Sequence, residues 1–369
     1  MHIKIIELAF IIVLGWLMGT NDSKRNRLYY IILCSMGLIF IGAMRSPEWM
    51  ERAYSIDTLK YKEMFETFCD MNWDEIWSSF LLRYLSDGDD FDIGYIALNK
   101  VVGYFTQDFH IFSVIADLIF FIPFGILLNR YCKSMSQLIF GFVFYIALIQ
   151  MYLFGGARQM FAIGFDMIAL LSILDKKNIR AAVFFLFGVT IHFSSLLFLI
   201  PMLMIWFNVK SRFLKYLHGI LLFLAPIALM MPNDIILFMG NLTGVERYSN
   251  YGMNAIQGGA VTFIILIEML SLFCMIAIKK KDLNDNEIFR KLYVMVPFFT
   301  FFAPLIRSNG SMDRIALYFY IYLVVLITFA VECMFKEKER RTVYALTITA
   351  LSLLIVLNDN FIYFFFWER

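Results

Sequence analysis

The stretch FHIFSVIADLIFFIPFGILL (residues 109–128) contains only one Asp, Glu, Lys or Arg residue, Asp117. A helix needs about 20 mostly apolar residues to cross a hydrocarbon core of roughly 30 Å. A short basic segment, from Arg130 to Lys133, follows the stretch directly. An apolar run of this length that ends in a basic loop is typical of a transmembrane helix with its C-terminal end in the cytoplasm.

The rest of the chain repeats this pattern. Hydrophobic residues make up 61% of the 369 residues and charged residues only 17%, too little polar surface for a soluble protein of this length. Similar segments lie near residues 3–19, 28–44, 136–154, 158–174, 216–231, 260–278, 292–306, 313–334 and 342–357. The sequence therefore predicts an all-α polytopic transmembrane bundle of about ten spans, as a single transmembrane domain over residues 1–369.

Loop charge orients these spans, because short loops rich in Lys and Arg stay in the cytoplasm. Five short connections are basic, at residues 24–27, 130–133, 176–180, 279–281 and 336–341. The long stretch 45–92 holds 12 acidic and 5 basic residues, a net charge of −7, and is expected outside. The resulting topology alternates along the chain and places both termini outside.

One apolar run, residues 181–207, lies between two basic loops and does not fit a single crossing. Two short helices of about 12–14 residues that turn near His192 would keep both loops inside, as a re-entrant or tilted hairpin buried among other helices. The alternative is one long tilted helix, with one of the basic loops on the opposite side of the membrane.

The segment 45–107 is predicted to form an extracytoplasmic amphipathic loop within the domain. Tyr61, Phe65 and Phe68 recur at helical spacing, which predicts a helix with one aromatic face. Such a helix can lie in the headgroup plane with its rings at the membrane interface. A second amphipathic piece is expected from Ile93 to Tyr104. We interpret the region as a lid over the outer face of the membrane; simple interfacial anchoring is a compatible alternative.

Four arginines stand where apolar spans meet the predicted outer face, although cations are less expected there. They are Arg45, Arg158, Arg307 and Arg314. A guanidinium donates two parallel hydrogen bonds to phosphate oxygens and keeps its charge when desolvated, so a converging set would bind a membrane-embedded diphosphate. Snorkelling, or pairing with acidic residues such as Asp57 and Asp313, is the alternative for each arginine.

His192 is the one histidine placed inside an apolar run, and an imidazole at a helix break suits a general base near neutral pH. A core histidine that caps the turn is the alternative. Asp117, Asp166 and Glu268 fall within predicted spans, where each should be paired, protonated or facing a wet cavity. Together these three carboxylates favour a second hypothesis, a proton- or ion-coupled transporter.

Several familiar motifs are missing from the sequence. It contains no Walker motif, GxSxG or HExxH, and its five cysteines are dispersed without a CxxC pair. No metal or cofactor is therefore expected, and no basic, aromatic-rich stretch indicates nucleic-acid binding. Without a nucleotide site, the energy for any synthesis must come from a substrate that already carries a good leaving group.

Short motifs follow one another in order over residues 45–320. They are Arg45, D-T-x-x-Y at residues 57–61, D-x-G-Y at 92–95, Arg158-Gln159, IHFSSLLFLIP at 191–201, and Arg314 followed by Tyr318 and Tyr320. The ordered set resembles the EpsG/Wzy-type polysaccharide polymerases. Two departures concern the outer loop: residues 50–56 contain no glycine, whereas members often show R-x-P-x-x-G-x-D-T, and Asp92 stands where Glu is common.

The resemblance implies a membrane glycosyltransferase with a GT-C-like or ligase-like helical architecture in the bacterial cytoplasmic (inner) membrane. Such an enzyme joins undecaprenyl-diphosphate-linked oligosaccharide repeats, as donor and acceptor, on the periplasmic or extracellular side and releases undecaprenyl diphosphate. The family also implies a chain-length regulator as a partner. The rival functions are a transporter or flippase of lipid-linked sugars and an O-antigen-ligase-like transferase.

In this interpretation, His192 or Asp57 accepts the proton of the attacking sugar hydroxyl. Arg158 and Arg314, with Arg45 or Arg307, stabilise the diphosphate as its charge grows. The remaining contacts with the substrate are expected from Tyr61, Asp92, Tyr95, Gln159 and Tyr318, with Trp49 as a further aromatic surface for sugar rings.

Overall fold

The computed structural model describes residues 2–48, 57–78, 92–150, 155–243, 261–280, 287–308, 310–357 and 363–367. Within these residues the regular structure is helical, and the extended backbone pairs only in an isolated bridge between Arg45 and Phe365. The all-α prediction is therefore confirmed. The chain divides into two compact units, of which unit 1 comprises Met1–Leu197 and Tyr344–Arg369, and unit 2 comprises Phe198–Val343.

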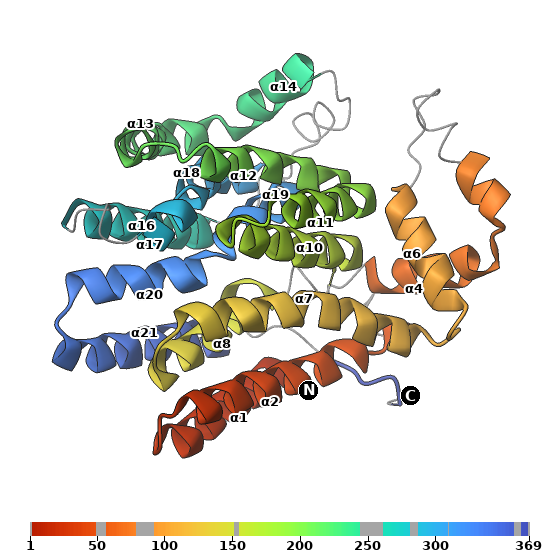
Figure 1. Cartoon of the computed structure of the whole chain (residues 1–369), viewed down its shortest axis with the longest axis horizontal. Helices are drawn as coiled ribbons and strands as arrows, with labels where there is room; N and C mark the ends of the chain where they lie inside the picture. The colour runs from red at the N-terminus through yellow and green to blue at the C-terminus, as the bar shows by residue number, and fades with distance from the viewer. Residues whose placement is uncertain are drawn as a thin grey trace. The chain divides into compact units, whose positions relative to one another are not determined.

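Unit 1 is a set of packed helices (Figure 1). They are α1 (Ile3–Gly19), α2 (Lys24–Ala43), α4 (Asp57–Asp70), α6 (Ile93–Gly103), α7 (Phe109–Tyr131), α8 (Met135–Leu148), α10 (Ala157–Leu174), α11 (Asn178–Ile191) and most of the 3₁₀ helix η1 (Phe193–Phe198). α21 (Glu337–Leu357) starts in unit 2 and contributes most of its length to unit 1.

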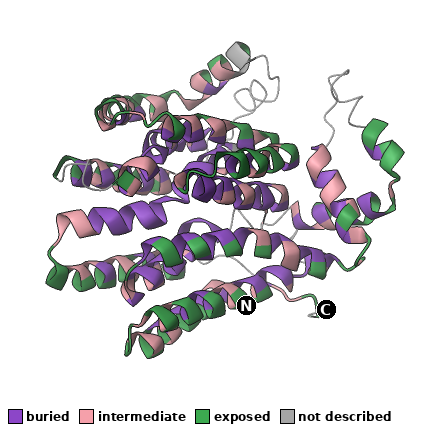
Figure 2. Ribbon diagram, viewed as in Figure 1, coloured by how far each residue is buried: buried purple, intermediate pink, exposed green. Residues whose placement is uncertain are grey.

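α10 is the helix around which unit 1 is packed. It lies against α7 on one side and α11 on the other, and its residues are mostly buried, whereas α11 exposes one face (Figure 2). A Cβ atom added to Gly164 would collide with the backbone oxygen of Ile119, so glycine is what lets α10 approach α7 this closely. α10 is therefore packed between two neighbouring helices along its buried length, and its first turn begins at Ala157.

The basic loops of unit 1 gather at one end of its helices. Arg27 donates a hydrogen bond to the backbone oxygen of Lys133 at 2.7 Å, and Arg130 pairs with Asp175 at 2.5 Å. Asp22, just before α2, accepts from the backbone N–H of Met135 at 3.0 Å. The three loops at residues 24–27, 130–133 and 176–180 therefore share one side, as the charge rule predicts for cytoplasmic loops.

The aromatic face of the predicted outer helix is present in α4, but its partner differs from the expectation. Tyr61, Phe65 and Phe68 are all buried. The ring of Phe65 stacks on Phe112 of α7 at 4.7 Å between centroids, and Phe68 contacts Tyr95 of α6 at 6.3 Å. The expectation that these three rings lie at the membrane interface is therefore wrong, because they pack on protein.

Unit 2 consists of shorter and more broken helices. They are α12 (Leu199–Trp206), α13 (Ser211–Met230), α14 (Pro232–Thr243), α16 (Val261–Lys280), α17 (Glu287–Leu292), α18 (Met295–Phe302), the 3₁₀ helix η3 (Ala303–Arg307), α19 (Gly310–Tyr320) and α20 (Leu323–Met334). The chain bends by 46° between α19 and α20.

A buried polar network holds the core of unit 2 together. The imidazole of His218 in α13 hydrogen bonds to the hydroxyl of Tyr293 and, at 2.6 Å, to Ser271 of α16. The hydroxyls of Ser271 and of Thr300 in α18 are also 2.6 Å apart. Because polar groups inside a membrane must find partners within the protein, this network fixes α13, α16 and α18 relative to one another.

The ten predicted spans all correspond to helical segments, but fewer reach the length of a crossing. Within the described residues, seven helical segments are long and apolar enough, or eight when the bent pair α19–α20 counts as one span. The other two predicted spans are α1, with 17 residues, and α8, which ends at Leu148 after 14. The run 181–207 is divided at His192, whose backbone is extended, as the two-helix interpretation predicts.

Candidate functional site

Three charged or polar side chains from distant parts of the sequence meet in unit 1. The carboxylate oxygen Oδ2 of Asp92 lies 3.6 Å from Nδ1 of His192 and 3.9 Å from Nη1 of Arg158. The Asp92 side chain is 9% exposed, whereas those of Arg158 and His192 are 22% and 24% exposed. A buried carboxylate thus stands between a cation and an imidazole that a substrate can reach.

Each of the three residues stands at a helix end. Asp92 immediately precedes α6, but its side chain does not cap that helix, and it faces Arg158 and His192 instead. Arg158 is in the first turn of α10, and His192 follows the last residue of α11. Helix ends can bring side chains together without long loops. The unpaired backbone N–H and C=O groups of such loops would be costly close to the membrane.

A close approach of α6 to α11 sets the position of Asp92 relative to His192. A Cβ atom at Gly94 would collide with the side chain of Thr190 and lie 2.7 Å from its backbone carbonyl carbon. Gly94 is two residues after Asp92, and Thr190 is two residues before His192. The glycine of the D-x-G-Y motif therefore has a physical role, because a larger residue would push the carboxylate away from the imidazole.

A second contact fixes the turn that carries His192. The Ser195 hydroxyl donates to the Asp166 carboxylate, 2.9 Å from Oδ1 and 2.7 Å from Oδ2, and both residues are at most 1% exposed. The Ser195 N–H donates to the His192 carbonyl at 2.9 Å. A Cβ atom at Gly188 would lie 2.8 Å from Asp166 Oδ1, so this turn is tightly packed on α10. The histidine is thereby held to α10, the helix whose first turn carries Arg158.

Tyr61 and Tyr95 form the buried aromatic side of the site. Their ring centroids are 6.1 Å apart, and the rings are 5% and 0% exposed. Burial, with a smaller contribution from Tyr61, raises the pKa of the Tyr95 hydroxyl, which stays protonated. Gln159 is also buried, at 2% exposed. The roles of these three residues toward a substrate stay predictions.

Arg45 occupies a more buried position in unit 1. Its side chain donates to the backbone oxygen of Gly42, and the residue is 4% exposed. A Cβ atom at Gly42 would collide with the Asp117 carboxylate, which attracts the Arg45 guanidinium. Asp117 therefore has the cationic partner that a carboxylate within a span requires. Asp57 is the first residue of α4, one turn before Tyr61 on the same helix.

The remaining two arginines belong to unit 2. Arg307 donates to the backbone oxygen of Leu229, at the end of α13, at 2.8 Å. Arg314 is half-buried in α19, where Asp313 and Tyr318 are each 1% exposed. Two of the four arginines thus lie in each unit, and a shared diphosphate clamp stays a prediction. Trp49 lies outside the described residues.

The Asp166–Ser195 contact was not foreseen from the sequence, which indicated only that Asp166 must have a partner. The two residues are 29 positions apart, and a hydroxyl within an apolar run has many possible acceptors. Among the described residues, no group of three or more His, Cys, Asp or Glu side chains could hold a metal ion.

The chain was compared with known protein families, curated proteins and solved structures. The EpsG family model matches residues 50–366 of the chain. This range includes Asp92, Arg158 and His192, together with both residues of the Asp166–Ser195 contact. No curated protein and no solved structure matches.

Proposed function

Because the chain belongs to the EpsG family, we propose that it joins undecaprenyl-diphosphate-linked oligosaccharide repeats at the outer face of the membrane. The family supports a membrane polysaccharide polymerase, a glycosyltransferase-type activity. The lipid carrier, the release of undecaprenyl diphosphate and the location in a bacterial cytoplasmic membrane are our proposal. So is a chain-length regulator as an additional partner.

The position of Asp92 between Arg158 and His192 is the observation that supports this proposal most directly. Glycosyl transfer from a diphosphate requires a cation for the leaving group and a base for the attacking hydroxyl. Arg158 would supply the cation and His192 the base, and they lie 3.9 Å and 3.6 Å from the same carboxylate oxygen of Asp92. The end of unit 1 that holds them is opposite the basic loops, which agrees with a site on the outer face.

The proposed reaction is a single displacement at the anomeric carbon of the growing chain. The acceptor hydroxyl of a new lipid-linked repeat forms a bond to that carbon, and the bond from the carbon to the diphosphate oxygen breaks. The electron pair of the broken bond leaves with undecaprenyl diphosphate. The hydroxyl proton passes to Nε2 of His192, because Nδ1 faces Asp92. No metal or nucleotide takes part in the proposed step.

The three side chains have separate roles in this step. Arg158 donates hydrogen bonds to the diphosphate oxygens as negative charge grows on them. Asp92 orients the imidazole and stabilises the imidazolium that forms, and its attraction to Arg158 keeps the guanidinium at the site. Asp166 and Ser195 are positioning residues, because they hold the turn of His192 and do not themselves reach the diphosphate.

Replacing Ser195 by alanine should lower kcat about 10- to 100-fold with little change in KM, because a displaced base slows the reaction without weakening binding of the diphosphate. Ser195→Thr, which retains a hydroxyl, should recover part of the rate. Ser194→Ala is the neighbouring control. Melting temperatures show whether each variant is folded, and a folded Ser195→Ala variant with the wild-type kcat would refute the positioning role.

The function itself is tested with purified protein in proteoliposomes and an isolated undecaprenyl-diphosphate-linked repeat, followed as a ladder on a gel. We expect products that increase by one repeat at a time and release of undecaprenyl diphosphate in equal amounts. A single addition would identify a ligase-like transferase instead. Proton-driven movement of the lipid-linked repeat that depends on Asp166, without any ladder, would identify the transporter.

A further inference from the structure

A groove separate from the candidate site lies at one end of α13 and α16 in unit 2. Its volume is about 530 Å³. It is lined by Arg212, Lys215, Tyr216, Gly219, Ile220, Phe223, Leu224, Met275 and Lys279. The first part of α13 forms one wall, and the last turns of α16 form the other. Both of these helix ends belong to loops that their basic residues predict to be cytoplasmic.

The mouth of the groove is strongly cationic. Arg212, Lys215 and Lys279 line it, and there is no carboxylate among its described lining residues. The Arg212 guanidinium lies over the ring of Tyr216, 5.7 Å from the centroid, and its Nη2 atom is 3.5 Å from the Tyr216 hydroxyl. By contrast, Arg130 of unit 1 is paired with Asp175 at 2.5 Å. The groove therefore presents positive charge to which an anion can bind.

The remainder of the groove is apolar and open. Ile220, Phe223 and Leu224 follow the cations along α13, at 57%, 78% and 42% exposed, and Met275 faces them from α16. A Cβ atom at Gly219 would meet nothing within 4 Å. Packing within the protein therefore does not require a glycine at position 219. The absence of a side chain there leaves the floor of the groove empty.

We propose that this groove binds one anionic glycerophospholipid of the adjacent leaflet, with its headgroup phosphate on Arg212, Lys215 and Lys279. One of its two acyl chains would follow the apolar strip that continues along α13. Basic pockets between transmembrane helices on the cytoplasmic side are suited to anionic lipid headgroups. An acidic peptide would match the charge but not the apolar strip, which is an exposed face of a helix long and apolar enough to cross a membrane. This binding site is independent of the proposed polymerase reaction.

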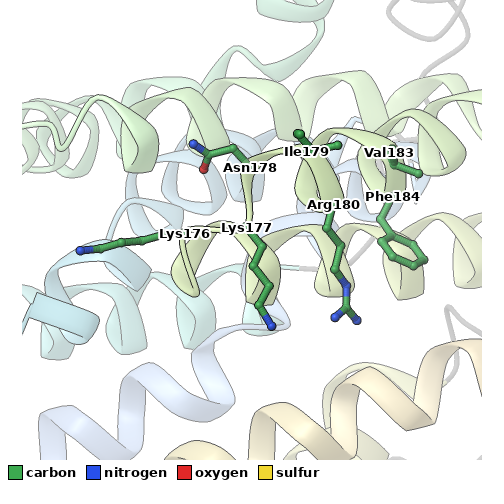
Figure 3. Close-up of a pocket in the computed structure, with 7 residues that line it drawn as sticks. All are labelled: Lys176, Lys177, Asn178, Ile179, Arg180, Val183 and Phe184. Atoms are coloured by element: carbon green, nitrogen blue, oxygen red, sulfur yellow. The ribbon is translucent and has the colours of Figure 1, made fainter.

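Unit 1 offers a matched control with the same number of cations. A shallow hollow at the start of α11 is lined by residues 176–180 together with Val183 and Phe184. Figure 3 shows Lys177 and Arg180 extending to the same side, while Lys176 extends away from them. Among the described residues, one continuous stretch of chain lines this hollow, and no second helix provides an opposite wall. It therefore has the charge of the groove without its shape.

The experiment measures the melting temperature of the full chain in a non-ionic detergent during titration with phosphatidylglycerol or phosphatidylcholine. We expect phosphatidylglycerol to raise the melting temperature of the wild type and phosphatidylcholine to have little effect. Substituting glutamine at Arg212, Lys215 and Lys279 together should raise the half-saturating concentration of phosphatidylglycerol about tenfold or more. The same substitution at Lys176, Lys177 and Arg180 should leave it unchanged.

A second variant tests the shape of the groove without changing its charge. Gly219→Leu fills the open floor at a position where a Cβ atom meets nothing within 4 Å, so it should weaken phosphatidylglycerol binding and leave the lipid-free melting temperature no lower than that of the wild type. The proposal is overturned if either groove variant responds to phosphatidylglycerol as the wild type does. It is also overturned if inorganic phosphate alone gives the same stabilisation, because the site would then be an anion site without a lipid.

Discussion

Replacing Arg158 by alanine should reduce polymer formation about 10²- to 10³-fold, because the leaving diphosphate would lose the cation that stabilises its growing charge. The contact of Arg158 with Asp92 is long, at 3.9 Å, and the arginine side chain is 22% exposed, so the folded protein should tolerate its removal. The measurement is the rate of ladder formation by equal amounts of purified protein in proteoliposomes. The amount of Arg158→Ala protein in the membrane should be close to that of the wild type.

Two comparison variants make the Arg158 result specific. Arg158→Lys retains the charge but not the forked donor geometry, so it should keep only part of the activity. Arg180→Ala removes an exposed arginine from α11, in the same unit but next to the basic loops, and should polymerise normally. Wild-type chain lengths from Arg158→Ala would remove this arginine from the mechanism.

The apolar segments and the helix break at His192 could be read from the sequence because both signals are local. About 20 apolar residues are needed to cross the membrane, and this requirement identified helices in every predicted segment. α1 has the predicted bounds, but the end of α8 was less predictable, since an apolar run can extend past the residue where a helix ends. α8, for example, ends at Leu148 although apolar residues continue after it.

The partners of the helices were harder to predict than the helices. The spacing of Tyr61, Phe65 and Phe68 defines a buried face, but lipid and protein both accept aromatic rings. Packing of Phe65 on Phe112 depends on how α4 meets α7, and no pattern within either segment specifies it. The same reason explains why the Asp166–Ser195 contact was not foreseen.

The candidate site was predicted in part. Arg158 and His192 were singled out by residue type and position, and Asp92 by the resemblance, and the structure brings the three together in unit 1. Their pairing was not predicted, because Asp92 was expected to contact the substrate and the arginines were expected to gather with one another. Arg45 instead lies buried beside Asp117, where its charge offsets that of a carboxylate within a span.

Replacing His192 by alanine should lower the rate of polymerisation about 10²- to 10⁴-fold, because the acceptor hydroxyl would lose the base that takes its proton. Asp57→Asn is the direct comparison, since Asp57 is the other residue that could accept this proton. A large loss in the histidine variant with near-normal activity in Asp57→Asn assigns the base to His192. The opposite result assigns it to Asp57, and full activity in both would exclude both.

Chemical rescue separates a base from a residue that only holds the turn. The His192 side chain is 24% exposed, so its removal leaves a space that a small molecule can enter from outside. Added imidazole should then restore part of the activity of His192→Ala in proportion to its concentration, and Asp92 would orient the added ring as it does the native one. Imidazole should not restore Ser195→Ala, which retains its histidine. If imidazole fails to raise the rate of a folded His192→Ala protein, the loss of activity must come from a displaced turn rather than a missing base.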